Sequence, residues 1–512
     1  MEYRITFSAR YLIVASVVCF CFVRSVEKVL HRSNYFITHL SSGMRSILLW
    51  LVVLVFANLA MSACAPFAPA PRSGLEEAPL PDSFSIQDSI YDPRQRWWET
   101  MGDEELNSFV DEALAGNQTL LSYWARFERA QALARKAGAD LKPSLTGDAG
   151  ASYTKIHTGD AGSTENENYA LGLIASYEVD LWGRIRAIHE SALLEAEASR
   201  EDLNGAAMTV AAEVSDRWIS ILSQRLQRQL LEQQLVTNTT YLDLVELRFR
   251  KSLASALDVF QQRQLVERVR AQLPLIEMQE RMLENQLAVL LGRMPNQAPR
   301  ISRQALPVIA AVPAAGLPVQ LLQDRPDIAA ALRRIEASDQ DLAAARADRL
   351  PALRLTGSAA YDNDELEELF DNWIVNLAAS LTGPIFDGSR RKAQVDINRA
   401  EVQQQLAEYR QVVLSAVREV EDALISETKI REHIAALENQ LQAGQNALSE
   451  ARTRYVNGLN DYLPVLTQLL SVQNLENDLI QRHEDLLVAR INLYRAIGGS
   501  WVDDLAPPAQ NN

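Results

Sequence analysis

The chain repeats itself once, and this duplication limits the folds open to it more than any other feature. Three pairs of segments carry the repeat at offsets of 208, 206 and 206 residues: Leu141–Leu145 with Arg349–Leu353, Phe249–Val259 with Tyr455–Val465, and Leu287 and Gly292 with Leu493 and Gly498. Because these matches lie tens of residues apart and share nearly one offset, we predict two equivalent halves. The first half covers 97–293 and the second 325–501, with a linker over 294–324.

Each half has the same order of patterns: a helix, two strands, a long helix, a turn and a second long helix. The helical patterns are 118–140 and 184–249 in the first half and 326–347 and 390–455 in the second. The two long patterns contain no proline, and their glycines are Gly205 and Gly444. At about 1.5 Å per residue each would extend about 100 Å, and the mixture of leucine with Gln, Glu and Arg is typical of coiled coils.

Four segments alternate strictly between apolar and small polar residues. We predict strands at about 145–155, 169–179, 353–362 and 373–382. Segments of about ten residues, with aromatic residues at their ends and one polar side, are typical of membrane β-barrels, although a soluble hairpin with one wet face has the same pattern. Four strands cannot close a barrel, and open edges are not tolerated in lipid, so the chain must oligomerise. Three copies would supply twelve strands and two copies only eight, which leaves little lumen.

The N-terminal region has the features of a secretory signal that ends on a cysteine. Met44–Arg45 starts an apolar run that closes with Met61–Ser62–Ala63–Cys64, which resembles a bacterial lipobox. We predict a lipoprotein signal over 44–63 and lipidation of Cys64 as an N-palmitoyl, S-diacylglycerol cysteine; the alternative is a buried structural cysteine after a membrane anchor. Ala65 is not the aspartate that resembles an inner-membrane retention signal, which favours the outer membrane.

The regions around this signal are assigned no active role. We interpret 1–43, with Cys19 and Cys21, as a non-native upstream extension, so that Met44 is the true start. The proline-rich stretch 64–96 is expected to be a tether that keeps the acyl anchor away from the folded body. Residues 502–512 are expected to form a flexible tail. No cysteine lies beyond Cys64, so the body contains no disulfide and no thiolate metal site.

Charge and motifs exclude several functional classes. The formal net charge is −16, with 66 acidic and 50 basic side chains, whereas a nucleic-acid interface needs a basic stripe. An acidic surface is usually only solubilising; an acidic lumen that favours cations is the alternative. The chain has no phosphate-binding glycine loop, no nucleophile elbow and no histidine pair at metal-ligand spacing, so we expect no enzyme.

Four motifs, taken together, resemble the TolC-like outer-membrane efflux factors, in particular their NodT-type lipoprotein branch. They are Asp180–Arg184 (DLWGR), Leu321–Leu322 with Arg325–Ile328 (RPDI), Gly383–Gly388 (GPIFDG) and Arg454–Leu463 (RYVNGLNDYL). The resemblance covers about 430 residues. It implies a mainly α-helical chain with a membrane β-barrel part, and a homotrimer whose twelve-stranded barrel continues as a twelve-helix periplasmic tunnel.

The resemblance also implies where passage is controlled. The turns at Ser252–Leu253 and Asn457–Gly458–Leu459 would form the periplasmic tip and contact an adaptor protein. Leu463 matches the hydrophobic constriction of relatives, although helix packing alone is the alternative. Thr467 stands where close relatives carry an aspartate ring, so Asp461 or Asp258 would have to supply any acidic gate.

The function implied is a passive exit duct in the outer membrane for drugs or other small amphipathic compounds. Its partners would be a periplasmic membrane-fusion adaptor, a proton-driven inner-membrane transporter of the resistance-nodulation-division class, and outer-membrane lipid. No cofactor or metal is expected apart from the covalent lipid on Cys64. The alternatives are a duct for type I protein secretion or metal efflux, or a structural helical lipoprotein without membrane strands.

Overall fold

A computed structural model describes residues 66–72, 96–159, 162–309 and 324–505. The chain divides into two units, Met1–Pro66 and Phe67–Asn512, and almost all described residues belong to the second. The predicted signal 44–63 and Cys64 lie outside the described residues, as do parts of the linker and of the C-terminal tail.

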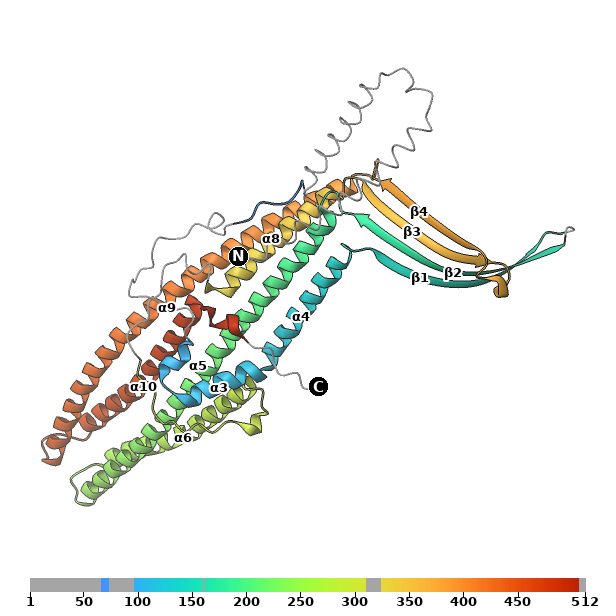
Figure 1. Cartoon of the computed structure of the whole chain (residues 1–512). Helices are drawn as coiled ribbons and strands as arrows, with labels where there is room; N and C mark the ends of the chain where they lie inside the picture. Colours follow the sequence, from blue (N-terminus) through green and yellow to red (C-terminus); the bar gives the residue numbers. More distant parts are fainter. Residues whose placement is uncertain (1–65, 73–95, 160–161, 310–323, 506–512) are drawn as a thin grey trace. The chain divides into compact units, whose positions relative to one another are not determined.

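Three helices of the first half correspond to three helices of the second (Figure 1). In the first half they are α4 (Gln118–Ala139), α5 (Arg184–Arg250) and α6 (Ala256–Leu290), and in the second α8 (Pro326–Ala347), α9 (Arg390–Val456) and α10 (Leu463–Ile497). Helices α5 and α9 both contain 67 residues, so each extends about 100 Å. The predicted duplicated, mainly helical fold class is confirmed.

The four strands form one antiparallel sheet in the order β1-β2-β3-β4. They are β1 (Ser144–His157), β2 (Ser163–Val179), β3 (Ala352–Asn363) and β4 (Trp373–Thr382). The central pairing joins the halves, with Tyr169 opposite Asn363 and Val179 opposite Leu353. The first hairpin is longer than the alternation predicted, because polar residues at its far end continue the ladder to the pair His157 and Ser163.

An additional helix, α3 (Glu104–Gly116), was not predicted. Asp103 caps it by accepting hydrogen bonds from the backbone N–H groups of Glu105 and Leu106 at 2.9 and 3.1 Å. Beside it the short helices η1 (Trp97–Met101) and η6 (Ser500–Asp504) meet: Trp98 lies edge-on to Trp501 with ring centroids 4.6 Å apart. This cluster belongs to the largest apolar core, which packs the middle of α5 against α3 and the end of α6.

Charged side chains hold each helical hairpin together, but the two halves use opposite charge arrangements. In the first half Arg225 of α5 binds Glu280 and Glu284 of α6 at 2.7 and 3.0 Å. In the second half the acid is on the long helix: Arg490 of α10 donates from Nε to Glu427 of α9 at 2.9 Å. Glu284 and Arg490 are equivalent at the offset of 206, so the polarity of the ion pair is reversed between the two halves.

The proline-rich stretch is not simply a spacer, and this corrects the expectation from its composition. Phe67 packs against Ala187 of α5 and against Ala343 and Ala344 of α8. Arg72 binds Asp339 of α8 through two hydrogen bonds of 2.6 and 3.2 Å. Residues 67–72 are therefore part of the folded body, because an aromatic ring and a bidentate ion pair give specific contacts that composition alone does not reveal.

Replacing Glu427 with Gln should strongly destabilise the α9–α10 hairpin. Glu427 is fully buried and Arg490 is nearly so, and removing the charge of one member of a buried pair typically costs about 3–5 kcal/mol. The measurement is the denaturant midpoint of the helical circular dichroism signal. Glu432→Gln is the matched control, because both side chains of its ion pair with Lys429 are exposed. An equal loss of stability in the two variants would contradict the stabilising role of the buried pair.

Candidate functional site

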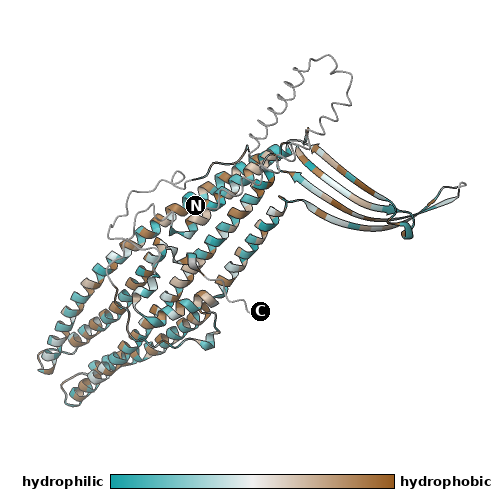
Figure 2. Cartoon of the chain, in the orientation of Figure 1, coloured by the Kyte–Doolittle hydropathy of each residue, from teal (hydrophilic) through white to brown (hydrophobic). Residues whose placement is uncertain are grey.

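The register places the apolar residues of all four strands on one continuous face of the sheet. Across β3 and β4, Tyr361 lies opposite Trp373 and Leu353 opposite Leu381. Directly paired residues of an antiparallel sheet share a face, so the alternating sets found in the sequence join into one surface. Figure 2 shows the alternation along each strand. The predicted division into an apolar and a polar face is confirmed.

The apolar face is exposed in the single chain, with Leu377 86% and Trp373 69% exposed. The opposite face carries small polar residues such as Thr146, Ser358 and Asn376. Ile156, Ile174 and Ile374 are large apolar residues on that side. Ten residues tilted by about 45° rise by about 24 Å, the height of the apolar band of a membrane barrel.

Each strand-to-helix corner turns through a residue with positive φ. At the end of β2, Gly183 has φ 78°, and Asp180 accepts hydrogen bonds from Ile185 N and Arg186 N at 3.1 and 3.0 Å. At the end of β4, Gly388 has φ 62° and Asp387 accepts from Arg391 N at 3.2 Å. This backbone N–H and the Arg391 guanidinium lower the pKa of Asp387. The two motifs are structural, as their residue types suggested.

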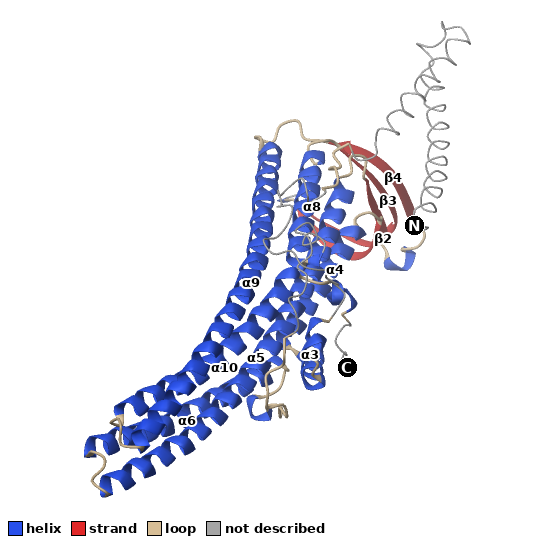
Figure 3. Ribbon diagram, turned by 90° about the vertical axis from the view of Figure 1, so that its left-hand side faces the viewer, coloured by secondary structure: helices blue, strands red, loops and turns tan. Residues whose placement is uncertain are grey.

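The two tip turns have the same backbone geometry and lie at the same end of the helical body (Figure 3). Ser252 has φ 59° and Gly458 has φ 72°, and these residues are equivalent at the offset of 206. Leu253 N bonds to Arg248 O and Leu459 N to Arg454 O, both at 2.9 Å. Apolar residues of both hairpins form a common core behind these turns.

The residues predicted for the constriction lie together at the start of α10. Leu463 is 58% exposed, and Thr467 follows one turn later, with its hydroxyl donating to Leu463 O at 2.9 Å. Asp461 is exposed, and its carboxylate has no hydrogen bond or ion pair with the residues that the structure describes. Asp258 differs, because it accepts a hydrogen bond from Ser255 N at 2.9 Å in the capping box of α6.

A buried polar network behind the tip was not found from the sequence. Tyr462 donates to Gln262 at 2.7 Å, and Gln262 donates to the carbonyl of Asn238 at 2.7 Å. Gln473 donates to the Asn238 side chain at 2.9 Å. Burial raises the pKa of the Tyr462 hydroxyl, which therefore stays a neutral donor. The network links the α5–α6 hairpin to the α9–α10 hairpin through four residues with little or no exposure to solvent.

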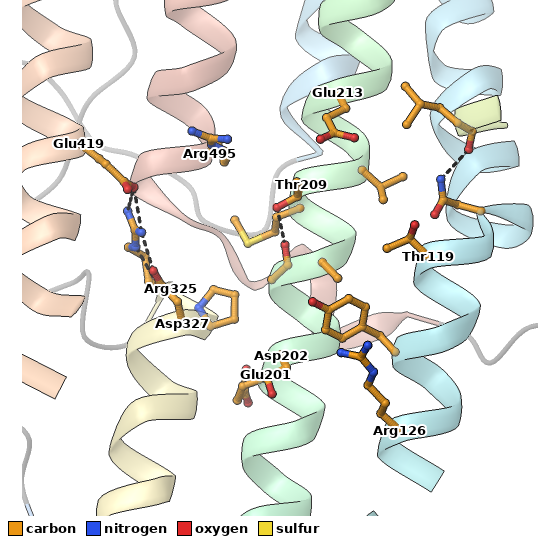
Figure 4. A pocket seen from close by; sticks show the side chains of 18 residues that line it. Thr119, Arg126, Glu201, Asp202, Thr209, Glu213, Arg325, Asp327, Glu419 and Arg495 are labelled. Atoms are coloured by element: carbon orange, nitrogen blue, oxygen red, sulfur yellow. Dashed lines mark hydrogen bonds and ion pairs between the residues drawn. The ribbon is translucent and has the colours of Figure 1, made fainter. Parts of the chain in front are cut away.

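A pocket of about 720 Å³ lies among α4, α5 and α8 (Figure 4). Its walls carry acids such as Glu201 and Glu213 together with the base Arg126. Arg325, also on the wall, is bound by Asp327 at 2.6 Å and by Glu419 at 3.0 Å. The pocket thus has mixed charge, and its most buried base is already paired.

The part of the chain that the structure describes has neither a cluster of metal ligands nor a membrane-spanning helix. No set of three or more His, Cys, Asp or Glu side chains there is arranged to hold a metal ion. Among the same residues, every helix is too short or too polar to cross a membrane.

The family model for outer membrane efflux proteins matches residues 109–293 and 317–499. The chain is 33% identical over 462 residues to the pyoverdine export outer membrane protein OpmQ of Pseudomonas aeruginosa, covering 88% of this chain and 97% of OpmQ. It is 31% identical over 465 residues to the outer membrane protein OprJ of the same organism, covering 86% and 94%. The solved outer-membrane channel OprN superposes with a TM-score of 0.78 at 28% identity, covering 85% and 99%.

Exchanging the residue types at the two equivalent tip positions should have opposite effects on stability. A side chain at positive φ is strained, so Gly458→Ser should lower the free energy of unfolding by about 1 kcal/mol, whereas Ser252→Gly should leave it unchanged or raise it slightly. Nothing lies within 4 Å of a Cβ at Gly458, so the backbone alone determines the loss. The denaturant midpoints of the two variants measure these effects. Gly150→Ser is the control, because a Cβ at Gly150 also has no atom within 4 Å and the backbone there has no positive φ. A similar midpoint for Gly458→Ser and Gly150→Ser would refute the assignment.

Proposed function

Because this chain belongs to the outer membrane efflux protein family and is the outer-membrane exit duct of an efflux system, we propose that it conducts drugs or other small amphipathic compounds. The observation that carries the duct is the four-stranded sheet, apolar on one face and polar on the other, whose strands run directly into long helices. The cargo is supported by the relative named for pyoverdine export.

The duct is a homotrimer in this proposal. The sheet order leaves β1 and β4 at the edges, and each is paired on only one side within the described chain. Pairing β4 of one copy with β1 of the next extends the sheet, and three copies give the twelve strands of a closed barrel. The same ring brings the helices together as a twelve-helix tunnel, with the polar face of the sheet toward the lumen.

The chain needs partners to drive transport. We infer a periplasmic membrane-fusion adaptor that contacts Ser252, Leu253, Asn457, Gly458 and Leu459, and a proton-driven inner-membrane transporter behind it. The exposure of Leu253 and Leu459 at the tip supports this contact. The duct itself performs no reaction in this proposal and needs no cofactor apart from the lipid on Cys64. That lipid and the apolar sheet face would both lie in the outer membrane.

Control of passage is proposed at Leu463, with Asp461 as the acidic group and Thr467 as a neutral neighbour. The exposed side chain of Leu463 and the unpaired carboxylate of Asp461 support this assignment. Metal efflux and type I protein secretion are the alternative uses of the duct. Metal efflux is the weaker one, since the methionines and histidines do not cluster in the sequence.

Deleting the gene should make the cell several-fold more susceptible to a subset of small amphipathic compounds and should raise their accumulation. The reason is that the inner-membrane transporter then has no exit across the outer membrane. A compound panel on the deletion strain measures both effects, and complementation with the intact gene is the control. Unchanged susceptibility and accumulation across the panel would rule out this cargo; a change confined to metal salts would favour metal efflux.

Truncating the constriction should increase conductance. Leu463→Ala removes an apolar side chain from each of three copies, and since Leu463 is largely exposed in the single chain the cost in stability should be small. Planar-bilayer recordings of the purified trimer measure the effect. The matched variant is Leu257→Ala, at the equivalent position of the first half and 63% exposed. An increase for Leu257→Ala alone would move the constriction to the other hairpin.

A further inference from the structure

The pocket of about 720 Å³ shown in Figure 4 is large enough for a drug-sized molecule. Its walls come from α4, α5, α8 and α9, and from the C-terminal ends of α6 and α10 at Leu290 and Arg495. All of these helices belong to one compact unit of the chain. A single copy of the chain therefore supplies every wall of the pocket.

Six of the eight charged side chains on these walls already have a partner within the chain. They are Arg325 with Asp327 and Glu419, Asp202 with Arg334, Glu201 with the amide of Asn204, and Arg126 with the ring of Tyr123. The two that remain are Glu213 of α5 and Arg495 of α10. Both are exposed, and neither has a hydrogen bond or an ion pair with a described residue.

The two unpartnered charges are opposite in sign and lie on different walls. Figure 4 shows Glu213 and Arg495 on separate helices that border the pocket, apart from the bound group of Arg325, Asp327 and Glu419. They are not within ion-pair distance of each other. A molecule that carries both signs of charge can therefore contact both walls at once. The planar guanidinium of Arg495 suits a carboxylate, which it can bind through two parallel N–H groups.

The pocket opens on the side of α5 that faces away from α3. Ala207 and Ala211 of α5 belong to the core shared with α3, whereas Gly205, Thr209 and Glu213 line the pocket at intervals of four residues. Two positions along a helix differ by about 200° around its axis, so the two sets lie on opposite faces. In the proposed ring of helices α3 has to lie outside, because three copies of it would block the tunnel. The pocket then opens into the lumen.

We propose that this pocket is a lumenal binding site for small zwitterionic amphipathic compounds, with Glu213 binding the cationic group and Arg495 the anionic group. The apolar part of the compound lies against Tyr123 and Leu290, which are half-buried on the walls. The site selects zwitterions because a compound with one charge leaves the other wall without a partner. This rests on the proposed cargo and names a chemical class within it.

Three dansyl probes that differ only in charge test the selectivity. Lysine dansylated on its side chain carries an ammonium and a carboxylate, dansylcadaverine carries only the ammonium, and dansyl-aminocaproic acid carries only the carboxylate. The fluorescence of each probe is titrated against the purified protein in lipid nanodiscs, and the signal of empty nanodiscs is subtracted. The dissociation constant of dansyl-lysine should be about tenfold lower than that of either other probe. Equal dissociation constants for the three probes would overturn the proposal.

Variants of the two charged residues test their roles. Glu213→Gln and Arg495→Gln should each weaken the binding of dansyl-lysine about tenfold, because each removes one charge-assisted contact. The matched controls are Glu190→Gln on α5 and Arg452→Gln on α9, which are exposed and lie outside the pocket walls. The exchange Glu213→Arg with Arg495→Glu should restore much of the affinity that either single reversal loses, since a zwitterion can bind in the opposite orientation. An equal loss in the controls, or no restoration by the exchange, would refute the assignment.

The site and the proposed function can fail separately. A monomeric protein would contradict the trimer, but the pocket lies within one chain and the titration would still measure its binding. Unchanged susceptibility of the deletion strain would contradict the proposed cargo, whereas binding that depends on Glu213 and Arg495 would still establish the site. The absence of dansyl-lysine binding, in a protein whose deletion does raise susceptibility, would overturn the site alone.

Discussion

Backbone pairing at the edges of the sheet is the constraint on which the rest of the structure depends. Strands β1 and β4 lie at opposite edges of a four-stranded sheet whose apolar face is largely exposed. In lipid, each unpaired backbone N–H or C=O group costs several kcal/mol, so the edges must find partners. The single chain is therefore an incomplete structure, and its hydrophobic surface becomes favourable only within a closed ring in a membrane.

The connections between strands and helices transmit this constraint to the rest of the chain. Each strand is joined to a helix by a short connection: α4 to β1, β2 to α5, α8 to β3, and β4 to α9. A ring of strands thus imposes a ring of helices at the same radius. Positive φ at Gly183 and Gly388, with aspartate caps beside them, lets a strand turn into a helix within a few residues. The duplication supplies this corner twice.

Structural features that depend on local periodicity can be predicted from the sequence. Contacts between side chains that are far apart in the chain cannot. Alternation fixed which strand residues share a face, and the absence of proline predicted the long helices. Tyr462 and Gln262 lie 200 residues apart, so no local pattern could join them. Phe67 was read as part of a linker because its neighbours are proline and alanine, and its partners follow more than 100 residues later. Helix α3 could have been found, because Asp103 followed by two glutamates is a helix-start signal.

The halves differ at the tip, and this difference supports the proposed place of control. Ser255 and Asp461 are equivalent at the offset of 206, but Ser255 and Asp258 cap α6 reciprocally, whereas the start of α10 has no side-chain cap. The acid of the first hairpin is thus used for helix stability, and Asp461 keeps its carboxylate unpaired among the described residues. In the proposed trimer the tip would present three such carboxylates beside three Leu463 side chains. The carboxylate of Asp461 and the apolar side chain of Leu463 then both lie in the α9–α10 hairpin. The α5–α6 hairpin supports it.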